Sequence, residues 1–151
     1  MRYLAKQLAI GALRRGQPIQ QFLGPATGFE LAGIRYLEIR PAARYELYLY
    51  FAEDIGTDQF FDVGEFPSLE VRDEEDGFGR LIARADEPEL ALETARRLAG
   101  AAMDRWVNAG LVEAEYVDYL VAGRPADAAL DGYRWPVQAD PPSLVSDGMW
   151  R

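Results

Sequence analysis

The side chains that could do chemistry in this 151-residue chain are carboxylates, tyrosines and a few hydroxyls. Histidine and cysteine do not occur, and lysine occurs once, at Lys6, against fifteen arginines. Histidine is the usual general base near neutral pH, and histidine and cysteine are the common zinc ligands. Their absence excludes zinc sites, Ser-His and Cys-His nucleophiles, disulfides and thiol redox chemistry. A carboxylate-pair hydrolase is the least demanding enzyme that this composition permits.

The acidic residues are concentrated in one stretch of the chain. The formal net charge is −9, yet the stretch from Glu53 to Glu93 holds fourteen acids against three arginines, and the other residues together carry +2. Loops and helix N-termini accept acids readily, but like charges on neighbouring turns repel one another. Phenylalanines are interleaved with these acids, and an aromatic ring within an acidic rim suits a basic protein partner. The same field repels nucleic acid and anionic membranes.

The turns of this stretch are therefore the predicted partner-binding surface. The residues expected to carry it are Glu65, Phe66, Asp73, Glu74, Glu75, Asp76 and Phe78. A merely solvated acidic face is the alternative explanation. The acids from Asp73 to Asp76 are consecutive, whereas a calcium loop needs acids at alternate positions. There is also no phosphate-binding glycine loop, so no metal, cofactor or catalytic residue is expected.

Hydrophobic periodicity predicts the elements that position these residues. Apolar residues at helical spacing predict a helix over 2–15, and a short turn and loop are expected over 17–28. Alternating apolar residues, Tyr and Phe predict strands over 34–39, 44–51, 59–63, 68–72 and 79–85. Short turns between successive strands indicate an antiparallel meander.

The helical period returns near Pro88. Asp86 is the expected N-cap of a helix that runs to about Asn108, and a last helix is expected over 111–121. From Asp131 onward, the Pro- and Gly-punctuated chain is expected to be an irregular tail that packs over the core through its tryptophans. The prediction is a single α+β domain over 1–151, with an N-terminal helix, an antiparallel sheet of about five strands and two C-terminal helices packed on one face.

Two smaller features bear on the surface. The sheet face with Tyr48 and Tyr50 is either packed under a helix or an open binding face. Glu115 and Asp118 share a face of the last predicted helix, and a solvated helix face is expected there. No run of about 18 apolar residues occurs and the N-terminus lacks a signal-peptide pattern, so a cytoplasmic protein is expected.

The chain is small and acidic, lacks histidine and cysteine, and is predicted to have a Tyr-rich sheet. Its acidic loops include Glu65-Phe66-Pro67 and Asp73 to Asp76. In these features it resembles bacterial polymorphic-toxin immunity proteins. The resemblance is one of overall character along the whole chain. It implies a non-catalytic inhibitor, monomeric or homodimeric, that blocks the active cleft of a basic toxin domain such as a nuclease or deaminase. Two alternatives stay open. One is a carboxylate-dependent hydrolase or lyase with a raised carboxyl pKa in a cleft, and the other is a structural or adaptor subunit.

Overall fold

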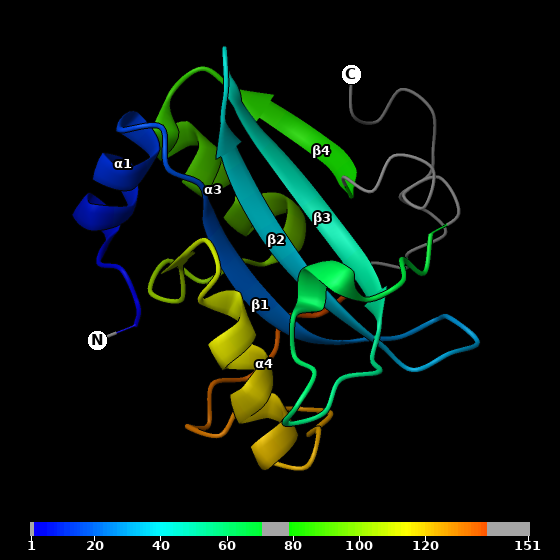
Figure 1. The fold of residues 1–151 in the computed structure, drawn as a ribbon. Helices are drawn as coiled ribbons and strands as arrows, with labels where there is room; N and C mark the ends of the chain where they lie inside the picture. The colour runs from blue at the N-terminus through cyan, green and yellow to red at the C-terminus, as the bar shows by residue number, and fades with distance from the viewer. Residues whose placement is uncertain (1, 71–78, 139–151) are drawn as a thin grey trace.

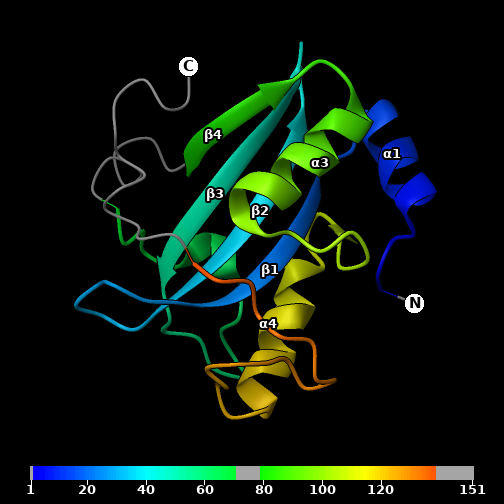
Figure 2. The same ribbon diagram turned by 180° about the vertical axis from the view of Figure 1, so that it is seen from behind.

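The chain forms an antiparallel sheet with helices on both faces (Figures 1 and 2). The computed structural model describes residues 2–70 and 79–138. The sheet has the strand order β4-β3-β2-β1-β5. Its strands are β1 (Ile19–Ala26), β2 (Gly33–Pro41), β3 (Tyr45–Glu53), β4 (Arg80–Ala85) and β5 (Val107–Asn108). The helices are α1 (Lys6–Arg14), α3 (Pro88–Ala99), α4 (Val112–Val121) and the short 3-10 helix η1 (Val63–Glu65). The predicted α+β class and the order of one helix, a five-stranded antiparallel sheet and two later helices are confirmed.

One face of the sheet packs against α1 and α3, which lie side by side in Figure 2. Alternate residues of β3, namely Leu47, Leu49 and Phe51, belong to this core together with Leu92 of α3. The buried face of α3 is rich in alanine, and small side chains let a helix lie close to a sheet. Trp106 is fully buried in the same cluster and supplies its largest side chain.

The opposite face has its own core, which α4 and η1 cover (Figure 1). Phe22, Ile34 and Tyr36 point to this side and pack with Tyr116 and Tyr119 of α4. The two later helices therefore cover opposite faces, whereas a single covered face was expected. The reason is that the strand positions facing away from α3 also carry large apolar residues, and these need a second cover.

The first strand of the sheet was missed, because residues 17–28 contain glycines and prolines that predict a turn and loop. β1 accommodates them in an irregularity: its pairing with β2 shifts register between Phe22 and Pro25. Gly24 lies inside this irregularity with a φ of 89°, and a Cβ there would lie 2.5 Å from the Trp135 ring. Glycine supplies both the positive φ and the close approach, so the strand continues through it.

Two predicted strands after β3 are wrong or only partly described. Of residues 59–63, Gln59 and Phe60 belong to a turn closed by the Thr57–Phe60 bridge, and Val63 begins η1. The prediction for 68–72 is met only by an isolated bridge between Ala52 and Ser68, and residues 71–72 lie outside the described part. The fifth strand is instead β5, whose two residues are too few to show a period.

α3 is shorter than expected. It ends at Ala99 because Gly100 adopts a left-handed conformation, φ 73°, that closes the helix. Beyond it the apolar stripe continues to Trp106 without helical structure, with Ala101 and Trp106 buried and Met103 partly buried. The N-cap is Glu87 and not Asp86, whose carboxylate instead accepts a hydrogen bond from Arg44 Nε at 2.8 Å.

The segment after α4 is irregular, as expected, up to residue 138. Its Trp135 ring packs edge-on against Phe22 at a centroid distance of 5.5 Å and against Tyr119 at 6.2 Å. Trp150 lies outside the described residues. Within residues 2–70 and 79–138, no helix is long and apolar enough to cross a membrane.

Candidate functional site

A polar cluster around the buried Asp54 carboxylate connects the loop after β3 to α4. The Tyr116 hydroxyl donates to Asp54 Oδ1 and accepts from the Gly56 amide at 2.9 Å. Arg124, just beyond α4, donates to Asp54 Oδ2 at 3.0 Å and to the Gly56 carbonyl at 2.8 Å. The Asp54 side chain is 3% exposed, and the Tyr116 hydroxyl and the Arg124 guanidinium supply its hydrogen bonds in place of water. Burial and the bond to Asp54 both raise the pKa of Tyr116, which keeps it a neutral donor.

Residues 54–66, here called the acidic loop, present acids and aromatic rings together. Asp58, Asp62 and Glu65 are exposed, and the rings of Phe60 and Phe61 are 41% and 39% exposed. In the described ranges, no arginine or lysine lies within ion-pair distance of these three acids. The loop therefore combines exposed apolar surface with negative charge that is not paired with any described cation.

Glu113, in the first turn of α4, lies beside Asp62 of the acidic loop. Partial burial raises its pKa to about 7, and a hydrogen bond with Asp62 and the charge of Asp62 act in the same direction. A glutamate whose pKa is raised by a neighbouring carboxylate indicates a site short of positive charge. The acidic loop and the start of α4 thus form one negative surface.

The predicted site residues fall in three groups. Glu65 is exposed on the acidic loop, as its assignment to a binding surface requires. Phe66 is 7% exposed, and its ring contacts Phe60 and Tyr116 at centroid distances of 5.2 and 5.3 Å. It fills the space between the loop and α4, so the expectation of a solvent-facing anchor does not hold for it. The others lie outside the described residues: Asp73, Glu74, Glu75, Asp76 and Phe78.

The exposed rings of Phe60 and Phe61 were missed because residues 59–63 were expected to be a strand of the core. A usable signal was present. Adjacent residues of a strand point to opposite faces, so two consecutive phenylalanines fit a one-sided core poorly.

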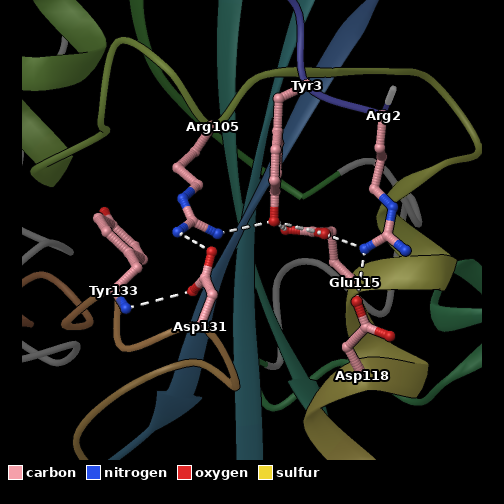
Figure 3. A network of polar contacts seen from close by, with 7 residues as sticks. All are labelled: Arg2, Tyr3, Arg105, Glu115, Asp118, Asp131 and Tyr133. Carbon is pink, nitrogen blue, oxygen red and sulfur yellow. Dashed lines mark hydrogen bonds and ion pairs between the residues drawn. The ribbon is translucent and has the colours of Figure 1, made fainter.

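A second polar site joins the N-terminus, α4 and the segment after it (Figure 3). Arg2 pairs with Glu115 and with Asp118, the latter at 2.6 Å. The Tyr3 hydroxyl donates to Glu115 at 2.9 Å and accepts from Arg105 Nη1 at 2.7 Å. Together with Trp135 and neighbouring side chains, these groups line a pocket of about 490 Å³.

The carboxylates of this pocket are held by arginines. Arg105 pairs with Asp131 at 2.5 Å, and this bond together with a backbone amide outweighs partial burial and lowers the pKa of Asp131. Burial and Glu115 raise the pKa of Tyr3 to about 12. The arrangement fixes residues 2–4 against α4. The expected solvated face is wrong for Glu115, whose side chain is 10% exposed because Arg2 and Tyr3 cover it.

Tyr48 and Tyr50 of β3 take part in a network of polar contacts with charged side chains of the sheet. Tyr50 stacks on Tyr36 at 4.5 Å, and its hydroxyl donates to Glu38 at 3.0 Å. Tyr48 donates to Glu46 at 3.0 Å, and the Arg40 guanidinium lies 4.0 Å above its ring. Because charges of both signs alternate here, this face lacks the surplus negative charge of the acidic loop.

No group of three or more acidic side chains in the described part of the chain is placed to hold a metal ion. Comparisons with protein-family models, with curated proteins and with solved structures give no match to this chain.

Proposed function

We propose that this protein is a non-catalytic binding module that docks a basic partner protein on the surface formed by the acidic loop and the start of α4. The observation that supports this most directly is the exposure of Phe60 and Phe61 beside three acids without cationic partners. Exposed aromatic rings supply burial on binding, and the surrounding charge accelerates association with an oppositely charged partner.

The contacts that hold both ends of the loop support the same function. Tyr116 and Arg124 fix its start through Asp54 and Gly56, and Phe66 fixes its end in the core. A preformed surface loses less conformational entropy on binding than a free loop does. The partner class that fits is a basic toxin domain whose active cleft is occluded, which makes the protein an immunity-type inhibitor. Asp73 to Asp76 and Phe78 remain predicted parts of the surface.

The carboxylate-dependent enzyme has less support. It requires a carboxyl group of raised pKa inside a cleft. Glu113 has the raised pKa, but it lines neither the pocket beside Arg2 and Glu115 (Figure 3) nor the pocket lined by Arg35 on the other side of the sheet.

The test compares two double variants with equal net charge. Asp58→Lys with Glu65→Lys changes the acidic loop, and Glu89→Lys with Asp104→Lys changes exposed acids on α3 and on the loop that follows it. The partner is first captured from a host lysate with the wild-type chain, identified by mass spectrometry, and then purified for titration. We expect the loop variant to raise Kd by about tenfold or more, mainly through slower association, and the control to stay within about twofold.

The refuting result is equal binding by the two double variants, which would show that only total charge matters. A third variant, in which the charges of Asp73 to Asp76 are reversed, tests separately whether these four predicted acids contribute to binding. A partner that is not basic, or whose Kd does not depend on salt, would also contradict the proposal.

A further inference from the structure

A second pocket lies on the opposite side of the sheet, between strands β2 to β4 and the C-terminal end of α3. It measures about 280 Å³, near the lower end for ligand pockets. Its apolar wall includes Leu49, Phe51, Ile82 and Leu98. All the charged residues that line it are arginines: Arg35, Arg96 and Arg97.

Arg35 is the unusual member. It is 4% exposed, and its guanidinium donates through Nη2 to the Pro136 carbonyl. Its Nε–H has no hydrogen-bond partner, and no carboxylate of the described residues lies within ion-pair distance of it. Buried charges in proteins are ordinarily paired. Arg80 on β4, 6% exposed, follows that rule through its contact with Glu70, although its Nε and Nη1 also lack hydrogen-bond partners. The lack of a carboxylate is therefore what distinguishes Arg35.

The roof of this pocket is held in place. Pro136 packs so closely on Gly100 that a Cβ there would lie 2.6 Å from the proline ring. The Gln138 side chain makes two hydrogen bonds with the backbone of Thr27, at 2.8 and 2.9 Å. Segment 136–138 therefore closes a formed pocket.

We propose that this pocket binds a small organic carboxylate, whose oxygens accept hydrogen bonds from the Arg35 guanidinium and whose apolar body lies against Leu49, Ile82 and Leu98. A guanidinium suits a carboxylate because it offers several N–H donors in a fixed plane. The apolar wall of the pocket favours an anion with a single charge. A singly charged carboxylate loses less hydration in an apolar pocket than a phosphate dianion does.

Burial lowers the pKa of the Arg35 guanidinium to about 10, with only the nearby Tyr133 acting in the opposite direction. A bound carboxylate would supply the negative charge that the described side chains do not. This site is independent of the proposed protein-binding surface, because the acidic loop and α4 pack on the other face of the sheet.

The test uses octanoate as the probe and 1-octanol as its uncharged counterpart, titrated into the full chain and followed by calorimetry and methyl NMR. We expect saturable octanoate binding that moves the methyl signals of Leu98 and Ile82, and at least about tenfold weaker binding of octanol. Arg35→Met should lose this preference for the anion. Leu98→Trp, which fills the pocket and keeps Arg35, should lose both ligands.

Arg84→Gln is the matched control, because Arg84 pairs with Glu46 at 3.1 Å outside the pocket, and it should bind octanoate like the wild type. The proposal is overturned by equal binding of octanoate and octanol, by absence of saturable octanoate binding at millimolar concentration, or by unchanged binding to Leu98→Trp. These three outcomes need only the wild type and Leu98→Trp, so they decide the question even where Arg35→Met fails to fold.

Discussion

The bond between Tyr116 and Asp54 can be tested by removing one oxygen atom. Tyr116→Phe keeps the buried ring and its contacts with Phe22 and Phe66 but deletes the hydroxyl. Two interactions disappear with it: the bond donated to Asp54 and the bond accepted from the Gly56 amide. Arg124 still contacts Asp54, so the carboxylate keeps one donor.

The expected cost follows from the burial of these groups. A hydrogen bond to a charged group contributes about 1.5–3 kcal/mol, and a buried N–H left without a partner costs about 1–3 kcal/mol. These two contributions share one hydroxyl and do not simply add, so we expect Tyr116→Phe to lower the free energy of unfolding by about 2–4 kcal/mol. With an m value of about 2 kcal/mol/M, the urea midpoint falls by about 1–2 M.

Urea unfolding followed by tryptophan fluorescence measures this loss, and amide hydrogen exchange at Gly56 shows whether the loop detaches first. Tyr119→Phe is the matched control, since Tyr119 lies on the same helix in the same cluster and its hydroxyl makes no hydrogen bond to another described residue. Its effect should stay within about 0.5 kcal/mol. If Tyr116→Phe costs no more than Tyr119→Phe, and Gly56 keeps its protection, then this cluster does not hold the acidic loop.

The remaining predictions concern α4. The folded-state pKa of Glu113, about 7, lies above its ordinary value of 4.5, so the folded chain binds this proton more tightly and loses stability as pH rises from about 4.5 to 7. Glu113→Gln should therefore raise the unfolding free energy at pH 8 by up to about 1 kcal/mol, after allowance for solvent screening, and leave it unchanged at pH 4. Urea titrations at both pH values measure this difference, and equal effects at the two values would contradict the prediction. Glu115→Ala should free residues 2–4 and remove the exchange protection of the Leu4 amide, which donates to the Trp106 carbonyl at 2.8 Å, whereas Asp118→Ala should not. Unchanged protection of Leu4 in the Glu115 variant would show that this ion pair does not hold the N-terminus.

Periodicity was sufficient for the elements whose residues alternate or repeat without interruption. β2, β3, β4, α1 and α4 were all expected close to their observed positions. β1 was not predicted because Gly24 and Pro25 lie in an irregularity of the sheet. Only the pairing with β2 shows that a strand passes through them. α3 was expected to be too long because buried residues continue past Gly100 in a non-helical segment, and burial alone does not distinguish the two.

The candidate site was harder to predict because long-range contacts build it. Asp54 and Tyr116 are 62 residues apart, and no local pattern relates them. The acidic composition did indicate the right stretch of chain, since Glu65 lies on the exposed loop. Composition could not distinguish the buried ring of Phe66 from the exposed rings of Phe60 and Phe61, because that difference depends on where α4 packs.

The structure also narrows the meaning of the acidic stretch. Four of its described acids are already paired: Asp54 with Arg124, Glu70 with Arg80, Asp86 with Arg44, and Glu93 with Arg96. Their charge is locally balanced and contributes little to a field at a distance. Among the described acids of this stretch, the unpaired charge therefore lies partly where Phe60 and Phe61 are exposed and partly at the start of α3. Charge alone does not separate these two places, but only the first also offers aromatic surface to bury. This is why the two double variants, equal in total charge, distinguish docking on the acidic loop from a general effect of acidity.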